Sequence, residues 1–153
     1  MVIRPSAGIT PSCYIIRTVL FHPFGHDVMT TRQRASLYAL ALLFVAAGTN
    51  HFINPEFYLE MMPPYLPAHL ELVILSGVFE IVAGLGVLLP RFRQKAGIFM
   101  ILIMIGVFPA NLHMALNPSA FPEVPTWFLY LRLPLQGLLI WWAWTATRVK
   151  ETI

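Results

Sequence analysis

Cysteine and charge are both scarce in this chain of 153 residues. Cys13 is the single cysteine, which excludes an intrachain disulfide, a CxxC redox motif and a cysteine zinc site. Charged residues make up 11% of the chain, whereas about 25% is usual for soluble domains. The sequence also lacks HExxH, GxGxxG, Walker and serine-triad motifs, and we expect no metal site. No known soluble catalytic module is therefore visible.

Hydrophobic residues dominate instead, at 58% of the chain with a mean hydropathy of +0.70. A water-soluble fold needs more polar surface than this, so the composition predicts a membrane protein. The net charge is +3, but the 10 basic residues form no contiguous patch, and we expect no nucleic-acid partner.

Four apolar stretches are long enough to cross a bilayer, since a transmembrane helix needs about 20 mostly apolar residues. They cover residues 35–53, 69–89, 96–116 and 127–147. Their connections are short, which favours antiparallel neighbours. We therefore expect an all-α fold, a polytopic four-helix antiparallel bundle that forms one transmembrane domain over residues 35–150.

The basic residues predict the orientation of the spans, because cytoplasmic loops carry an excess of Lys and Arg. Those that flank the spans are Arg32, Arg34, Arg91, Arg93, Lys95, Arg148 and Lys150. The loops over residues 54–68 and 117–126 contain neither Lys nor Arg. Both termini should therefore be cytoplasmic in an inner (cell) membrane, with these two loops outside. The aromatic residues interpreted as lipid anchors at the outer boundary are Phe57, Tyr58, Tyr65 and Trp127.

Residues 1–34 differ from the rest because they contain no sustained apolar run. Arg17 interrupts any signal-peptide core, although a basic, acid-poor segment is also compatible with an organelle transit peptide. Met29, followed by Thr-Thr-Arg-Gln-Arg, is an alternative start close to the first span. We interpret the segment as a disordered extension and assign no role to Cys13, His22 or His26.

The first outer loop carries Pro63, Pro64 and Pro67, which prevent a regular helix. Irregular backbone cannot face lipid, so we expect this loop to cover the outer end of the bundle. Pro67 suits the first turn of the second span.

Polar residues occur where a bilayer should exclude them. Glu80 lies near the middle of the second span, and Arg132 and Gln136 lie one turn apart in the fourth. A charge at the bilayer centre costs about 2.5–3.5 kcal/mol on insertion scales. We therefore expect Glu80 and Arg132 to face inward and form an ion pair, with Gln136 hydrogen-bonded to the carboxylate. The residues that share the face of Glu80, and whose small side chains would let another helix approach, are Ser76, Gly77, Ala83 and Gly84.

Further polar residues end the first and third spans in the same outer half. Asn50 and His51 end the first span, and Asn111 and His113 follow Pro109 in the third, where the proline should kink the helix. An ideal helix places Asn111 and His113 about 200° apart, so we favour Asn111 and treat His113 as the weaker candidate. The candidate polar cluster is Asn50, His51, Glu80, Asn111, Arg132 and Gln136.

This polar cluster has three interpretations. In the first, the cluster forms a site for a small polar or quinone-like ligand, or handles protons, because ionisable groups in membranes are costly and usually functional. A second interpretation is a hydrogen-bonded network that fixes helix register and nothing more. A haem held by His51 and His113 is the third, but two histidines are a weak signal and we do not favour it.

Several short motifs follow one another along the spans. They are H-F-x-x-P at residues 51–55, P-P-x-L-P at 63–67, S-G-x-x-E at 76–80, L-L-P-R-x-R at 88–93, F-P-A-N at 108–111 and R-L-P-L-Q at 132–136. In this order, over residues 36–147, they resemble the DoxX family of small four-helix membrane proteins. The resemblance implies a relationship to a membrane subunit of a thiosulfate-to-quinone oxidoreductase, or to four-helix assembly factors, and it supplies no catalytic residues.

We therefore expect a redox-associated membrane subunit in which Arg132, Gln136 and His51 hydrogen-bond a quinone and Glu80 relays a proton. The sequence shows no flavin, iron–sulfur or thiol machinery, so electrons must come from a partner membrane or redox protein. A non-enzymatic scaffold or assembly factor is the alternative. A transporter is third, because no internal repeat is evident. The sequence also leaves a homo-oligomer open.

Overall fold

The computed structural model describes residues 29–148, and within that range the chain is helical and contains no strand. The long helices are α2 (Thr31–Ile53), α4 (His69–Gly86), α5 (Arg93–Leu116) and α6 (Thr126–Thr147). Two short elements join them, the helix α3 (Pro55–Glu60) and the 3-10 turn η1 (Pro118–Ala120). The expected all-α fold class is confirmed.

The long helices match the predicted spans, apart from some of their ends. α2 begins at Thr31 rather than at residue 35, because Thr30 and Gln33 form a capping box. The Gln33 amide donates to Thr30 Oγ1 over 3.3 Å, and the Thr30 amide donates to Gln33 Oε1 over 2.9 Å. Residues 31–34 are therefore helical, and their assignment to a disordered extension was wrong. The interpretation of residues 1–28, with Cys13, His22 and His26, lies outside the described residues.

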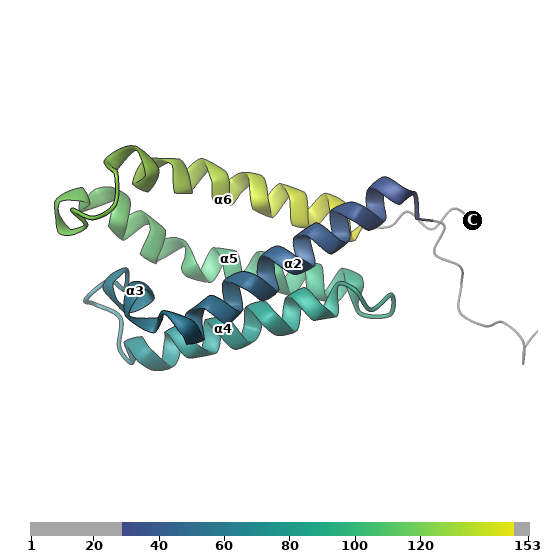
Figure 1. The fold of residues 1–153 in the computed structure, drawn as a ribbon, viewed down its shortest axis with the longest axis horizontal. Helices are drawn as coiled ribbons and strands as arrows, with labels where there is room; N and C mark the ends of the chain where they lie inside the picture. The colour runs from purple at the N-terminus through teal and green to yellow at the C-terminus, as the bar shows by residue number, and fades with distance from the viewer. Residues whose placement is uncertain (1–28, 149–153) are drawn as a thin grey trace, which may run out of the picture.

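The long helices form a ring of neighbours. α2 packs mainly against α4, α5 packs mainly against α6, and smaller contacts join α4 to α5 and α2 to α6. Figure 1 shows both described chain ends and the α4–α5 connection at one end of the molecule, which we call the terminal end. α3 and η1 lie at the opposite end, the α3 end, where the α2–α4 pair and the α5–α6 pair are spread apart (Figure 1).

Close contacts tie the helices together at the terminal end. Gly97 of α5 packs directly on the side chain of Thr147 in α6. Trp142 donates from Nε1 to Ser36 Oγ over 2.8 Å, which joins α6 to α2. The buried apolar side chains that fill this half are Leu37, Leu40, Ala41, Phe44, Ala83, Val87, Met100, Ile103, Met104 and Ala143.

α2 and α4 touch through glycines, so that their backbones are in contact. A Cβ atom built at Gly48 would lie 2.6 Å from the Gly77 carbonyl oxygen, and one at Gly84 would lie 3.0 Å from the Ala41 carbonyl oxygen. Only a residue without a side chain fits at these distances. The prediction that small residues on the Glu80 face admit a neighbouring helix is confirmed, and that neighbour is α2.

The first loop is more regular than expected. α3 precedes the prolines, so the irregular backbone is limited to residues 61–68. Pro67 lies before α4, which begins at His69 after Ala68 in the left-handed region (φ 55°), so its placement in the first helical turn was wrong. Met61 and Pro63 are buried. Met61 packs with Met114, Phe121 and Leu129, and these contacts hold the loop over the α3 end.

Three of the helices within residues 29–148 are long and apolar enough to cross a membrane, namely α2, α4 and α5. Only a third or less of the most apolar segment of each helix is buried, so much of its apolar surface is left outside the core, as in a membrane protein. α6 has the predicted length and position but is not among the three. Arg132, Gln136 and several tryptophans are spread along α6, so that it contains no segment as apolar as those of α2, α4 and α5.

Candidate functional site

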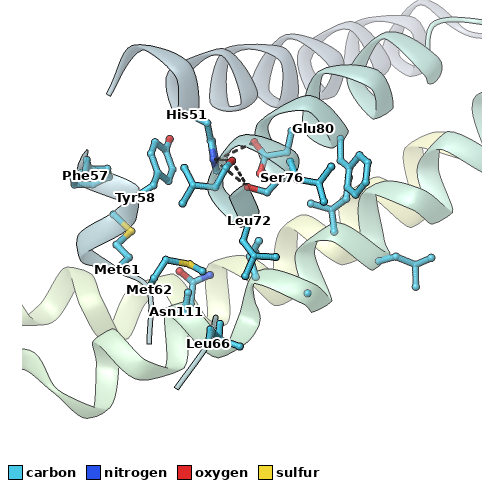
Figure 2. A pocket seen from close by; sticks show the side chains of 18 of the residues that line it. His51, Phe57, Tyr58, Met61, Met62, Leu66, Leu72, Ser76, Glu80 and Asn111 are labelled. Carbon is cyan, nitrogen blue, oxygen red and sulfur yellow. Dashed lines mark hydrogen bonds and ion pairs between the residues drawn. The ribbon is translucent and has the colours of Figure 1, made fainter. Parts of the chain in front are cut away.

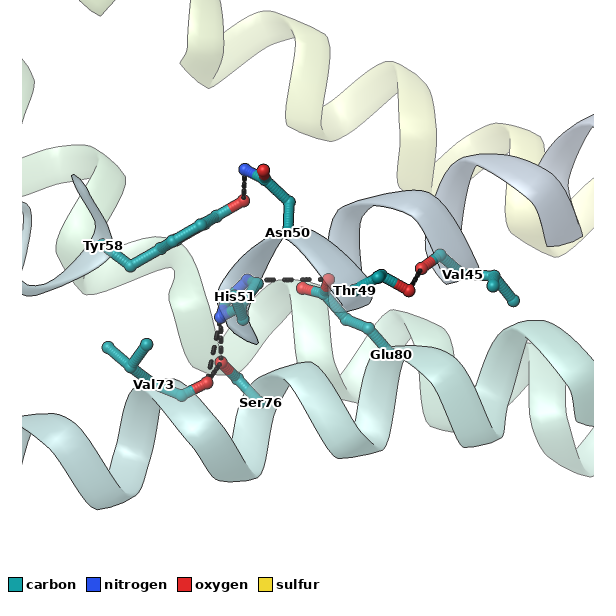
Figure 3. Close-up of polar contacts among 8 residues, drawn as sticks. All are labelled: Val45, Thr49, Asn50, His51, Tyr58, Val73, Ser76 and Glu80. Atoms are coloured by element: carbon teal, nitrogen blue, oxygen red, sulfur yellow. Dashed lines mark hydrogen bonds and ion pairs between the residues drawn. The ribbon is translucent and has the colours of Figure 1, made fainter. Parts of the chain in front are cut away.

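The site begins at His51, a buried residue near the end of α2. Its Nδ1 lies 2.9 Å from the Val73 carbonyl oxygen and 3.1 Å from Ser76 Oγ, both on α4 (Figure 3). The Ser76 hydroxyl also donates to the Val73 carbonyl over 2.9 Å. A carbonyl oxygen can only accept, so Nδ1 must carry a hydrogen atom. In a neutral ring, Nε2 is then the free acceptor.

Glu80 of α4 faces this free nitrogen. The distance from His51 Nε2 to Glu80 Oε2 is 3.7 Å, and side-chain exposure is 8% and 13% respectively. Glu80 Oε2 is buried and has no hydrogen-bond partner among the residues described. A proton held by either side chain would serve both, because Nε2 and a carboxylate are both acceptors until one is protonated. His51 and Glu80 therefore form one unit, which we call the His–Glu pair.

Tyr58 of α3 stacks on one face of the His51 imidazole ring. The two rings stack with centroids 3.7 Å apart and an interplanar angle of 24°. Asn50 donates from Nδ2 to the Tyr58 hydroxyl over 2.9 Å (Figure 3). Its side-chain oxygen accepts from Asn54 Nδ2 over 2.7 Å. Asn50 thus positions Tyr58 beside His51, and it does not line the cavities described below.

Arg132 does not pair with Glu80, contrary to the sequence-based expectation. Its Nη1 lies 3.1 Å from Met114 Sδ and 3.3 Å from Met61 Sδ, and its guanidinium carbon lies 5.1 Å from the Phe128 ring centroid. α4 and α6 lie across the ring from each other, whereas α2 is in direct contact with α4, so His51 takes the place next to the carboxylate. The guanidinium is left with two thioethers, which are weak acceptors.

Gln136 and Asn111 connect α6 to α5. Asn111 donates from Nδ2 to Gln136 Oε1 over 3.2 Å, and the buried Gln136 donates from Nε2 to the Met104 carbonyl. The amide of Gln136 is thus occupied within this helix pair, and the predicted hydrogen bond to the Glu80 carboxylate is replaced by these two contacts.

Two cavities lie between the helices beside these residues. The larger, of about 510 Å³, extends from the loop and α3 to α4 and α5, and the smaller is about 240 Å³. Glu80, Asn111 and Arg132 line both cavities, His51 lines the larger, and Gln136 lines the smaller. Figure 2 shows His51, Ser76 and Glu80 on one wall, Tyr58 and Met61 on the α3 side, and Asn111 on a facing wall. The rest of the lining is mainly apolar.

His113 lies apart from this cluster. Its Nδ1 is 3.2 Å from Asn117 Nδ2, its ring packs edge-on against Phe121, and it lines neither cavity. His113 therefore shares neither cavity with His51. In the part of the chain that the structure describes, no three His, Cys, Asp or Glu side chains are grouped so that they could hold a metal ion.

Sequence reasoning missed three residues that shape the site. Tyr58 was interpreted as a lipid anchor, and Met61 received no role at all. Ser76 was noted only for its small size. The alternation of polar and small residues in S-G-x-x-E was the available signal for Ser76, because it places the hydroxyl one turn from Glu80. No local pattern indicated Tyr58 or Met61, which reach the site through the path of the loop.

Comparisons with known proteins establish a family but no activity. The family model described as "Domain of unknown function (DUF8561)" matches residues 40–147. No curated protein and no solved structure matches the chain. The match spans most of α2 and all later helices, and it includes every member of the polar cluster. The chain belongs to this family of unknown function, and the resemblance to DoxX proteins stays a prediction.

Proposed function

We propose that this protein is a redox-associated membrane subunit that binds a quinone-like ligand in the cavity of about 510 Å³. The observation that carries the proposal is the composition of the cavity wall. Ligand sites are typically about 300–1,000 Å³ and mostly apolar, with a few convergent polar groups. Here the His–Glu pair, Asn111 and Arg132 converge on a cavity that is otherwise mainly apolar.

The polar groups suit a ring that carries oxygen acceptors. Arg132 has free guanidinium donors, because its described contacts are two thioethers and the Phe128 ring face. Asn111 offers a second amide hydrogen beside it. Both would donate to a quinone carbonyl, and the donated hydrogen bond of a guanidinium is worth about 1.5–3 kcal/mol.

The His–Glu pair suits the opposite side of such a ring. Quinone reduction adds protons to its oxygen atoms, so a site needs a group that can release or take up a proton nearby. The pair shares an unfilled hydrogen-bond position between Nε2 and Oε2, and both residues line the cavity. Electrons would come from a partner redox protein, because the chain shows no electron-carrying motif.

The membrane arrangement belongs to the same proposal. α6 would be a fourth span, antiparallel to α5, because its polar residues Arg132 and Gln136 are turned to the inside and its outward surface is apolar and aromatic. Both termini would be cytoplasmic in an inner membrane, since basic residues gather at the terminal end, whereas the loops at the α3 end, residues 54–68 and 117–125, contain neither Lys nor Arg. The proposal includes a relationship to DoxX proteins and leaves room for a homo-oligomer.

A direct binding measurement tests this function. Protein in lipid nanodiscs is titrated with decyl-ubiquinone while tryptophan fluorescence is followed, alongside Arg132→Met and Asn111→Leu. The native protein should show saturable quenching, and Arg132→Met should weaken binding about tenfold or more, the loss expected for a charged hydrogen bond. Tyr130→Phe, which changes an exposed residue of the same helix outside both cavities, serves as the control. Quenching that never saturates in the native protein would refute the proposal.

A scaffold or assembly factor is the second candidate. It is favoured by the internal contacts of Gln136, Asn111 and Asn50, which tie helices together whether or not a ligand is present. The same titration separates the two functions, because a scaffold needs no saturable quinone site and would retain its partner in Arg132→Met.

A further inference from the structure

α4 and α5 are close together near the terminal end and separate toward the α3 end. Near their connection, a Cβ at Gly86 would lie 2.9 Å from Ala96 Cβ. Further along, Phe79 and Phe99 meet edge-on with centroids 5.3 Å apart. Beyond this ring pair, the larger cavity lies between the two helices, lined by residues of both.

The cavity reaches the outer surface of the molecule between these helices. Leu75, Phe79 and Leu102 line it and are also 46%, 37% and 58% exposed. Gly106 lies in the same wall, is exposed, and a Cβ built there would meet no atom within 4 Å. The missing side chain of Gly106 therefore contributes to a gap between α4 and α5, which we call the side opening.

We infer that the ligand reaches the polar cluster sideways from the bilayer through the side opening, and that its hydrocarbon chain stays between α4 and α5. This inference rests on the proposed function and specifies the ligand as a quinone with a long apolar chain. At the α3 end, the buried Met61 and Pro63 hold the loop over the bundle.

The distribution of polarity along the cavity supports this pose. Its donors and acceptors, Ser76, Glu80, Asn111 and Arg132, are half-buried, whereas the side opening is lined by exposed leucine, phenylalanine and glycine. A head group with carbonyl oxygens matches these polar groups, and only a hydrocarbon chain matches the opening. The exposed faces of α4 and α5 beside it are apolar, as expected of surfaces in contact with lipid.

Two glycines give a matched test of the side opening. Gly106→Leu places an isobutyl group in the gap, and Gly137→Leu adds the same group to α6, where a Cβ also meets no atom within 4 Å and no cavity is lined. Both variants and the native protein are titrated with decyl-ubiquinone in nanodiscs. Gly106→Leu should weaken binding about tenfold or more, because the added side chain occupies the volume of the alkyl chain. Gly137→Leu should bind like the native protein.

A second measurement uses the native protein and does not depend on how the variants fold. A ubiquinone analogue with a photoreactive group at the end of its alkyl chain is bound, irradiated and located by mass spectrometry. Adducts on Leu75 or Leu102 would support sideways access. Saturable binding with adducts confined to Met62 and Leu66 of the loop would overturn it and leave the proposed function standing. Absence of saturable binding in the native protein would overturn both.

Discussion

Replacing Gly77 by alanine tests the α2–α4 crossing that holds His51 in place. The new Cβ would lie 2.7 Å from His51 Cβ and 2.9 Å from the Gly48 carbonyl oxygen. Neither atom is at the flexible end of a side chain, so the helices themselves must move apart. Such overpacking costs about 1–3 kcal/mol, while alanine in a helix gains about 1 kcal/mol over glycine. The net loss of stability should be up to about 2 kcal/mol, and relative to a glycine-to-alanine change at an open helical site it should be about 1–3 kcal/mol.

Two other glycines supply the controls for this prediction. Gly106→Ala and Gly137→Ala place a Cβ where nothing lies within 4 Å, so they keep only the helix-propensity gain of up to about 1 kcal/mol. The free energy of unfolding of all three variants is measured in mixed micelles with increasing denaturing detergent. Quinone binding is measured in parallel, because displacement of His51 should also weaken the site in Gly77→Ala. If Gly77→Ala unfolds no more easily than Gly137→Ala, the close crossing is wrong.

Further predictions concern the His–Glu pair, the Arg132 guanidinium and the orientation of the helices in the membrane. In a double-mutant cycle of His51→Asn and Glu80→Gln, residues in contact should show a coupling energy of about 0.5–3 kcal/mol; additive effects would contradict the His–Glu pair. Arg132→Met should leave the free energy of unfolding within about 1 kcal/mol while it weakens quinone binding, because removing the guanidinium orphans only thioethers; a loss of several kcal/mol would show a structural ion pair instead. With Cys13 replaced by serine, a cysteine at Glu123 should react with an impermeant maleimide in intact cells and one at Lys95 should not; the reverse pattern would contradict cytoplasmic termini.

The fold was largely predictable because a bilayer imposes simple rules on sequence. Helices that cross a bilayer must be about 20 residues long and outwardly apolar. The four predicted segments are helical, as α2, α4, α5 and α6, and the first three are long and apolar enough to cross a membrane. The ends were less predictable, since the capping box at Thr30 extends α2 beyond its apolar part. α3 was not predicted, because the prolines that follow it indicated an irregular loop for the whole connection.

The sequence indicated which polar residues lie at the site better than it indicated which of them interact with one another. The cost of buried polar groups indicated Glu80, Arg132, Asn111 and Gln136, and the structure brings them around shared cavities. Their partners depend on which helices are adjacent, and sequence periodicity does not carry that information. Glu80 therefore faces His51 across the tight α2–α4 contact, and Arg132 is left among sulfur atoms.

Chemical analysis of the purified protein tests the central claim most directly. The full chain is purified in a mild detergent, an ultraviolet–visible spectrum is recorded, and quinone is extracted and quantified against protein and phospholipid. Native protein should retain quinone at a ratio near one per chain, and Arg132→Met should retain far less. Quinone no more abundant, relative to phospholipid, than in the membrane from which the protein came would contradict a quinone site and favour the scaffold. A Soret band would instead identify a haem protein.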